Sequence, residues 1–154
     1  MQSSDLASIL RNDRAEFDRI REQDPRAEID LNGADLSGCD LKGVALGRAN
    51  LENASLRGAD CTGAILFGAN LTGADLRDAK LEGVNLHQAR LEGANLEGVT
   101  LGDIERPTRF CLNISSFRGT RWSRDELETM LGILNQNAGW EIKYELLPKG
   151  APAP

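Results

Sequence analysis

The sequence predicts a mainly β solenoid closed by a cap at each end, and two regularities lead to this prediction. From residue 31 to residue 101 an apolar residue recurs every five positions, and fourteen of these fifteen central residues are leucine, with Cys61 as the exception. Two residues before each central residue stands Ala, Val, Ile or Cys, and two residues after it stands glycine in ten of the fifteen repeats. A fixed period maintained over this length is typical of an architecture in which each unit packs on its neighbours.

A period of five is incompatible with a continuous helix or strand. At about 100° per residue a helix would turn successive leucines by about 140° and scatter them around its surface, and a strand would point them alternately to opposite faces. A short extended segment followed by a turn at the glycine fits the pattern, because the small residue and the central residue then share a face. The sequence therefore predicts a chain that bends once per five residues around a core formed by Leu36, Leu41, Leu46, Leu51, Leu56, Cys61, Leu66, Leu71, Leu76, Leu81, Leu86, Leu91 and Leu96.

The repeats ADLSG, ANLEN, ASLRG, ANLTG, ADLRD and ANLEG resemble the A(D/N)LXX motif of pentapeptide-repeat proteins. The resemblance implies a right-handed quadrilateral β-helix with four repeats per coil, in which residue i lies beside residue i+20. Five corners lack the usual glycine, which leaves the turn type open at Arg48, Asn53, Asp78, Gln88 and Asp103.

Four segments are expected along the chain: an N-terminal capping helix over residues 1–28, the β-helix over 29–122, a C-terminal helix and strand over 123–147, and a disordered tail over 148–154. A solenoid needs caps because its terminal core and backbone groups are otherwise open. The N-terminal helix is predicted to use Ser3 or Ser4 as its N-cap and to end before Pro25. Its apolar stripe consists of Leu6, Ile9, Leu10, Phe17 and Ile20.

The repeat changes register near residues 105–109. Three further repeats, shifted by one residue, are centred on Leu112, Phe117 and Trp122. We interpret the break as a one-residue insertion after which the coil resumes. All the repeats together would then form about 4.5 coils and a rod about 22 Å tall at the usual spacing of neighbouring strands.

The C-terminal cap is predicted as a helix followed by a strand. Ser123 and Glu126 match a capping box, and apolar residues continue along one helical face over residues 127–134. Residues 140–146 alternate apolar with charged side chains, as half-buried strands do. As an alternative to capping, the C-terminal helix would join two copies of the chain in a homodimer.

No catalytic, cofactor or metal site is expected, and the chain is not predicted to be an enzyme. His87 is the only histidine, and Cys39, Cys61 and Cys111 form no CxxC pair, so neither a zinc site nor a disulfide framework is indicated. The aspartates that precede central residues, such as Asp60, are expected to form a solvated surface ladder rather than an acid–base pair.

The sequence also argues against a membrane and against nucleic acid as direct partners. No apolar stretch approaches the about 18 residues of a membrane span and the N-terminus lacks the features of a secretory signal, so a cytoplasmic protein without membrane contact is expected. Residues 29–105 carry twelve acidic and six basic residues. This acidic excess argues against direct nucleic-acid binding.

One side of the predicted coil differs from the other three, which carry polar ladders. The outward residues of this fourth side are Ala45, Gly47, Ile65, Phe67, Asn85 and His87. Exposed apolar clusters often mark interfaces, so Ile65, Phe67, Asn85 and His87 form the candidate interaction face. The alternative is that the chain's own caps fold across this strip.

A regular rod with one unusual face and no catalytic groups predicts a non-enzymatic scaffold that binds an unidentified protein partner. The family resemblance implies an alternative, since some pentapeptide-repeat proteins mimic DNA and bind a type II topoisomerase such as DNA gyrase. The modest charge density of the repeat and the short rod argue against this alternative.

Overall fold

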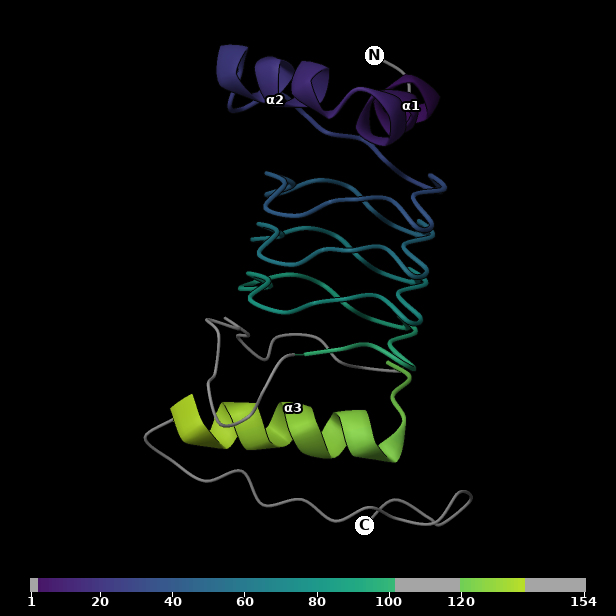
Figure 1. The fold of residues 1–154 in the computed structure, drawn as a ribbon, viewed down its shortest axis with the longest axis vertical. Coiled ribbons are helices and arrows are strands. Elements are labelled where there is room, and N and C mark those ends of the chain that lie inside the picture. Colours follow the sequence, from purple (N-terminus) through teal and green to yellow (C-terminus); the bar gives the residue numbers. More distant parts are fainter. Residues whose placement is uncertain (1–2, 102–119, 138–154) are drawn as a thin grey trace.

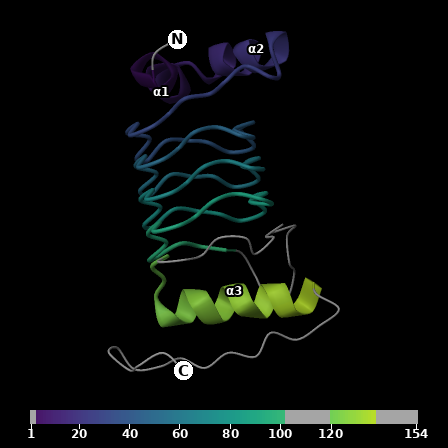
Figure 2. The same ribbon diagram turned by 180° about the vertical axis from the view of Figure 1, so that it is seen from behind.

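The computed structural model describes residues 3–101 and 120–137. A stack of coils lies between two helices at one end, α1 (Ser3–Asn12) and α2 (Arg14–Gln23), and a third helix at the other end, α3 (Arg124–Asn137). In Figures 1 and 2 all three helices lie across the ends of the stack rather than along its sides. The described helices therefore cap the ends of the stack and do not cover the sides of the coils.

The coil is four-sided because each residue that precedes a central leucine pairs with the residue twenty positions later. Parallel β-bridges join Asp30 to Asn50, Asp35 to Ser55, Asp40 to Asp60 and Ala45 to Ile65, and the same four series continue through the next coils. We call these series the first, second, third and fourth sides. Each side pairs through a single bridge residue, since the chain turns again before a longer strand can form.

Backbone hydrogen bonds join each coil to its neighbours in both directions. On the first side, Leu31 N donates to Asn50 O at 2.7 Å and Asn50 N donates to Ile29 O at 2.8 Å. At each corner, the amide of the next small residue donates back to the preceding central carbonyl, as Ala34 N does to Leu31 O at 3.0 Å. Positive φ occurs only at the third residue of such a turn, here Gly33 at 63°, which is the pattern of a type II turn.

The corners without glycine adopt the same conformation. Arg48, Asn53, Asp78 and Gln88 have φ values of 60°, 56°, 61° and 59°, next to a range of 61° to 81° for the corner glycines. Asp103 lies outside the described residues. The turn type that the sequence left open is thus unchanged at these four corners, and the backbone geometry is imposed by the stack rather than by glycine.

The interior is filled by the central residues and the small residues that precede them. The thirteen central residues from Leu36 to Leu96 are each at most 2% exposed. Among the described residues, no polar or charged side chain is buried with them. The core is therefore a column of leucine and alanine layers without polar interruptions.

The N-terminal cap consists of two helices, so the prediction of a single helix was wrong. Asp13 separates them: its amide donates to Ile9 O at 2.8 Å, and its Oδ1 accepts from Glu16 N at 3.1 Å, which makes Asp13 the N-cap of α2. α2 ends at Gln23, two residues before Pro25. The short polar side chain of Asp13 stops the first helix by starting a second one.

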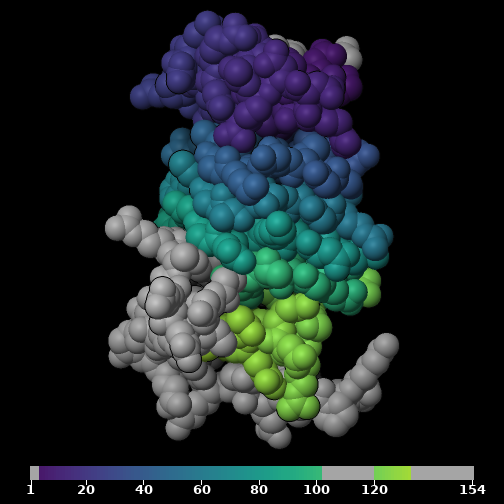
Figure 3. All heavy atoms as spheres, viewed as in Figure 1, coloured from purple at the N-terminus to yellow at the C-terminus, as the bar shows by residue number. Residues whose placement is uncertain are grey.

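The two N-terminal helices close the core and the hydrogen-bonding edge of the first coil. Leu6, Leu10 and Phe17 are buried against the coil. In Figure 3 the helices at the N-terminal end and the first coils form one continuous surface. The carbonyls of Asp35 and Lys42 have no preceding coil to pair with, and the guanidinium groups of Arg11 and Arg14 donate to them instead. The cap thus replaces both the apolar and the polar contacts of a missing coil.

At the C-terminal end, Arg121 continues the second side. It forms a parallel bridge with Asn95, Leu96 N donates to Arg121 O at 2.8 Å, and Arg121 N donates to Ala94 O at 2.9 Å. A one-residue insertion would have placed Arg121 beside Thr100 on the third side, so that interpretation of the register break was wrong. The chain from Asn95 to Arg121 is six residues longer than one regular coil, and the repeats centred on Leu112 and Phe117 lie outside the described residues.

Helix α3 begins with the predicted capping box. Ser123 N donates to Glu126 Oε2 at 2.7 Å, and Glu126 N donates to Ser123 Oγ at 3.4 Å. Glu126 Oε1 also accepts from Gly98 N at 2.7 Å, which ties the helix to the last coil. Met130 and Leu131 are buried against the end of the core.

The strand predicted over residues 140–146 and the tail over 148–154 lie outside the described residues. Of the helices that the structure describes, none combines the length and the apolar character needed to cross a bilayer.

Candidate functional site

The four sides of the coil differ in their charge. Asp, Glu, Lys or Arg side chains stand at outward positions of the first, second and third sides, but the outward positions of the fourth side carry none within residues 29–101. We call this fourth side the neutral side; its outward residues are Ala45, Gly47, Ile65, Phe67, Asn85 and His87. Ile65 is 45% exposed and is the only large hydrophobic residue among the described ones that is so exposed.

The structure brings the four predicted interface residues together. Ile65 and Asn85 form a parallel bridge on neighbouring coils. The rings of Phe67 and His87 stack with their centroids 5.6 Å apart and an interplanar angle of 18°. The Oδ1 atom of Asn85 accepts from His87 N at 3.0 Å, which fixes the start of the corner that presents the imidazole. The result is a flat patch with one aliphatic, one amide and two aromatic side chains.

A groove of about 690 Å³ runs between this patch and the end of the N-terminal cap. Ile65, Phe67 and Asn85 line it from the coils, together with Gly47 and Arg48, and Arg21 with residues 25–28 line it from the cap. The cap therefore borders the apolar strip but leaves Ile65 exposed. The sequence left open whether the chain's own caps fold across this strip. The N-terminal cap borders the strip along one margin and does not cover it.

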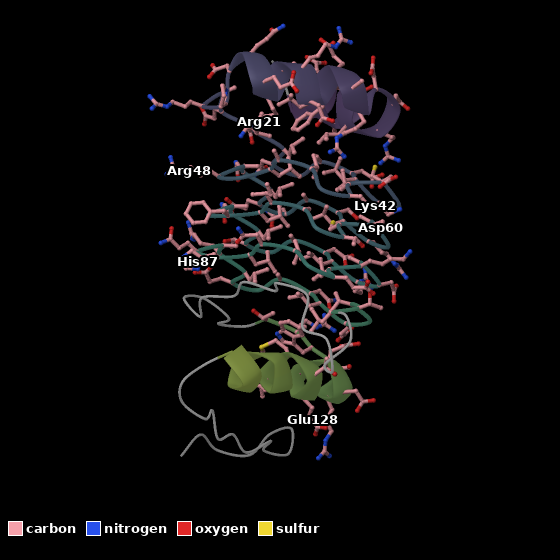
Figure 4. The ribbon with its side chains drawn as sticks, turned by 60° about the vertical axis from the view of Figure 1, so that its left-hand side comes forward. Arg21, Lys42, Arg48, Asp60, His87 and Glu128 are labelled. Atoms are coloured by element: carbon pink, nitrogen blue, oxygen red, sulfur yellow. The ribbon has the colours of Figure 1, made fainter. Side chains whose placement is uncertain are left out.

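Arg48 is a residue of this site that the sequence pattern predicts only as a corner residue. In Figure 4 Arg48 and His87 project from one side of the stack, whereas Lys42 and Asp60 project from the other. The sequence placed Arg21 in the predicted N-terminal helix and gave no indication that it belongs to a site. The rule of four repeats per coil is sufficient to place Arg48 beside the neutral side. It does not predict the path of the chain over residues 24–28.

The aspartate ladder on the third side is a structural network. Asp60 Oδ2 lies 3.4 Å from Lys42 Nζ and 3.2 Å from Lys80 Nζ, and Asp60 Oδ1 accepts from Thr62 Oγ1 at 2.7 Å. The hydrogen bonds from Thr62, supported by the two lysines, hold the pKa of Asp60 well below its usual range. A general acid at neutral pH needs a raised pKa, so this carboxylate is suited to stabilising the coil and not to proton transfer.

On the second side, too, a basic neighbour lowers the pKa of an aspartate. Arg77 Nε donates to Asp75 Oδ1 at 2.8 Å, and this contact lowers the pKa of Asp75 and raises that of Arg77. Oppositely charged neighbours thus neutralise each other along the ladder.

The two described cysteines are buried in the core. Burial raises the pKa of the Cys61 thiol to about 12 and also raises that of Cys39. Such thiols are protonated at neutral pH and have little nucleophilic character. Among the described residues no group of three or more His, Cys, Asp or Glu side chains could hold a metal ion, and Cys111 lies outside them.

Comparisons with known proteins agree with this architecture. The family described as pentapeptide repeats matches residues 34–73, 46–83 and 69–103, with eight copies of the repeat. Comparison with curated proteins gives no match.

Solved structures that are similar to the chain include two pentapeptide repeat proteins. The pentapeptide repeat protein Rfr23 from the cyanobacterium Cyanothece 51142 is 38% identical, with a TM-score of 0.55, over 61% of this chain and 60% of Rfr23. The chain thus spans less than two thirds of that protein. A pentapeptide repeat protein from the Arabidopsis thaliana thylakoid lumen is 31% identical over 71% of this chain and 78% of that protein, with a TM-score of 0.48. With its five-residue repeat, its four-sided coil and these relatives, the chain belongs to the pentapeptide-repeat protein family.

Proposed function

We propose that the protein is a non-enzymatic scaffold that binds a partner protein through its neutral side. The observation that carries this proposal is the exposure of Ile65 on a side without charged outward residues, next to the stacked rings of Phe67 and His87. Interface cores are depleted in charge and enriched in aromatic residues, whereas the three other sides have the charged character of solvated surface.

The rigidity of the coil supports the proposal. The coil that carries Ile65 is hydrogen bonded to both of its neighbours: Ile65 N donates to Val44 O on the preceding coil, and Leu66 N donates to Asn85 O on the following coil. A preformed patch orders few side chains on binding, which reduces the entropic cost of association. The ion-paired carboxylates on the second and third sides are unsuited to proton transfer, and the protonated thiols in the core are poor nucleophiles, so these described groups do not favour a catalytic function over a binding one.

The test compares two variants that add one carboxylate at equivalent positions. Ile65→Asp places a charge in the patch, and Thr100→Asp places one on the third side, where Thr100 is also an exposed residue that precedes a central leucine. Each immobilised protein is used to capture partners from the cells that express it, and quantitative mass spectrometry compares the captured proteins. Circular dichroism checks that both variants fold.

A protein captured by the wild type and by Thr100→Asp, but at least about tenfold less by Ile65→Asp, supports the proposal; such a loss corresponds to about 1.4 kcal/mol of binding free energy. If every captured protein is retained equally by both variants, the neutral side is not the binding surface.

The acidic excess of residues 29–105 favours a second candidate function, a DNA mimic that binds DNA gyrase. Against this candidate, several of the carboxylates lie within ion-pair distance of basic groups, such as Asp60 with Lys42 and Lys80, and Asp78 with Arg57 at 3.7 Å. A supercoiling assay separates the two candidates. We expect micromolar protein to leave gyrase activity unchanged, and inhibition would favour the mimic.

A further inference from the structure

The basic side chains that line the groove beside the neutral side differ from the other described basic side chains in their ion pairing. Thirteen Lys and Arg residues lie within residues 3–101 and 120–137. Ten of them form ion pairs, namely Arg11, Arg14, Arg19, Lys42, Arg57, Arg77, Lys80, Arg90, Arg121 and Arg124. The three that form no ion pair within the described part of the chain are Arg21, Arg26 and Arg48, and all three line the groove.

On this basis, and resting on the proposed function, we propose that the groove binds an acidic peptide segment of the partner, with an apolar side chain against Ile65 and Phe67 and neighbouring carboxylates on Arg26 and Arg48. Guanidinium groups bind carboxylates through paired, charge-assisted hydrogen bonds. Among the described residues that line the groove, Glu28 is the only acidic one. In a chain with a net charge of −6, the groove is a local excess of positive charge.

Arg21 marks the wall of the groove on the side of the cap. Its Nη1 donates to Ala27 O at 3.2 Å, which holds the guanidinium against the chain that leaves α2. Its Nε is buried and has no hydrogen-bond partner in the structure. Because this buried atom is not accessible from the groove, Arg26 and Arg48 are the groups that would meet the carboxylates of a bound peptide.

The apolar part of the groove distinguishes a peptide from other anionic partners. Pro25 and Ala27 line it on the cap side, and Ile65 and Phe67 line it on the coil side. A volume of about 690 Å³ accommodates a few side chains. A polyanion such as nucleic acid or an anionic membrane would meet only three cations here and the acidic surface of the repeat around them, which disfavours both.

The chain offers closely matched variants for a test. Arg48→Gln keeps the corner geometry, because Gln88 occupies the same corner two coils further along with a φ of 59° next to 60° at Arg48. Arg26→Gln changes an exposed side chain that follows the end of α2. Arg57→Gln removes the same charge from the second side, away from the groove, and serves as the control.

The experiment selects binders from a phage library of random seven-residue peptides against the wild-type protein, with competition by excess Ile65→Asp protein to remove peptides that bind elsewhere. We expect the selected sequences to place Asp or Glu next to Phe, Leu, Ile or Trp. Fluorescence anisotropy with the selected peptides should show about tenfold weaker binding to Arg26→Gln/Arg48→Gln, as for the loss of hydrogen bonds to a charged group. It should show affinity within about twofold of the wild type for Arg57→Gln, and weaker binding as salt is added.

The inference is overturned if the selected peptides carry no excess of acidic residues, or if they bind the double variant and the wild type equally. It is also overturned if a single-stranded DNA oligonucleotide or phosphatidylglycerol vesicles bind in an Arg48-dependent manner more tightly than any selected peptide. Failure of the proposed function has a different signature, since captured cellular proteins would then be insensitive to Ile65→Asp. Capture that depends on Ile65 but not on Arg26 and Arg48 would remove only the acidic-peptide inference.

Discussion

At the scale of single residues, the corners show how the stack dictates a conformation that most residues avoid. A non-glycine residue with positive φ costs about 1 kcal/mol or more, yet Arg48 and Gln88 adopt it next to glycine corners in the coils above or below. The side chain of a corner residue extends over the neighbouring corner. A Cβ built at Gly73 would lie 2.5 Å from Asn53 Oδ1, and one at Gly98 would overlap Asp78 Oδ1. As a rule, a Cβ at one corner therefore forces an Asn or Asp side chain at the preceding corner of the same column to move.

This rule predicts unequal effects of one substitution at two glycines. Gly63→Ala should cost about 1 kcal/mol from backbone strain alone, because a Cβ there meets nothing within 4 Å and the φ values of Gly63 and Gly73 are 67° and 69°. Gly73→Ala should lower the free energy of unfolding by at least about 1 kcal/mol more than Gly63→Ala does. In a double-mutant cycle, this extra cost should disappear when Asn53→Gly is also present. Urea denaturation measures the free energy of unfolding of the wild type, the three single variants and the double variant. Equal costs at the two glycines would show that Asn53 simply moves aside.

The sequence predicted which residues of the described coils, 29–101, face the core, because burial there follows directly from a strict five-residue period. It could not predict the conformation of corners such as Asp78, since the residue type there disfavours positive φ and only contacts twenty residues away enforce it. Nor could it predict Ile65 as a partly exposed residue beside a groove, because that depends on how the cap leaves the coil.

At the scale of elements, the ladder on the third side couples charge to stability. The pKa of Asp60 is lower in the folded protein than in the unfolded chain, so its contribution to stability is fully present above the unfolded pKa of about 4 and is lost as the pH falls toward the folded pKa. Asp60→Asn keeps the acceptor for Thr62 but removes the charge between two lysines.

We expect Asp60→Asn to lower the free energy of unfolding by about 1 kcal/mol at pH 7. The difference from the wild type should shrink as the pH falls from about 4 toward 2. Asp40→Asn is the control, since Asp40 Oδ2 lies 4.0 Å from Lys42 and its side chain is 72% exposed, and it should cost less than about 0.5 kcal/mol at any pH. Urea titrations at pH 7, 4, 3 and 2 give these values. A difference that stays constant with pH would rule out the ionised carboxylate as its source.

The C-terminal cap depends on one carboxylate that serves two elements. Glu126 accepts from Ser123 N in its own helix and from Gly98 N in the last coil. Glu126→Ala should therefore cost about 2 kcal/mol, more than a capping residue alone. Glu128→Ala should cost less than about 0.5 kcal/mol, because Glu128 only pairs with Arg124 within α3 and points away from the coils (Figure 4). Thermal denaturation of both variants tests this, and equal melting temperatures would mean that α3 does not brace the last coil.

Element boundaries were predicted less well than element types. The capping box at Ser123 was visible in the sequence because it is local. The division of the N-terminal segment at Asp13 was missed because the apolar stripe continues on both sides of it. The register break was misjudged because the chain between Asn95 and Arg121 returns to the second side rather than the third, and a count of repeats does not contain that path.

At the scale of the whole molecule, the caps turn an open stack into a finite one. The first coil would otherwise expose Leu31 and Leu36 at its end and leave the carbonyls of Asp35 and Lys42 without the donors that a preceding coil provides. An exposed apolar end with unpaired backbone groups favours association with another such end.

Removal of residues 1–27 should therefore change the association state as well as the stability. We expect the truncated chain to form dimers or larger species end to end at micromolar concentration, because association restores the apolar cover that Leu6, Leu10 and Phe17 provide and the backbone donors that Arg11 and Arg14 supply. Light scattering after size-exclusion chromatography measures the mass of each species. The double variant Arg11→Gln/Arg14→Gln separates the two contributions: with the helices in place it should lose stability but keep the mass of the intact chain. If the truncated chain has the same association state and melting temperature as the full chain, the end of the coil is self-sufficient, and the N-terminal helices serve chiefly to form one wall of the groove beside Ile65.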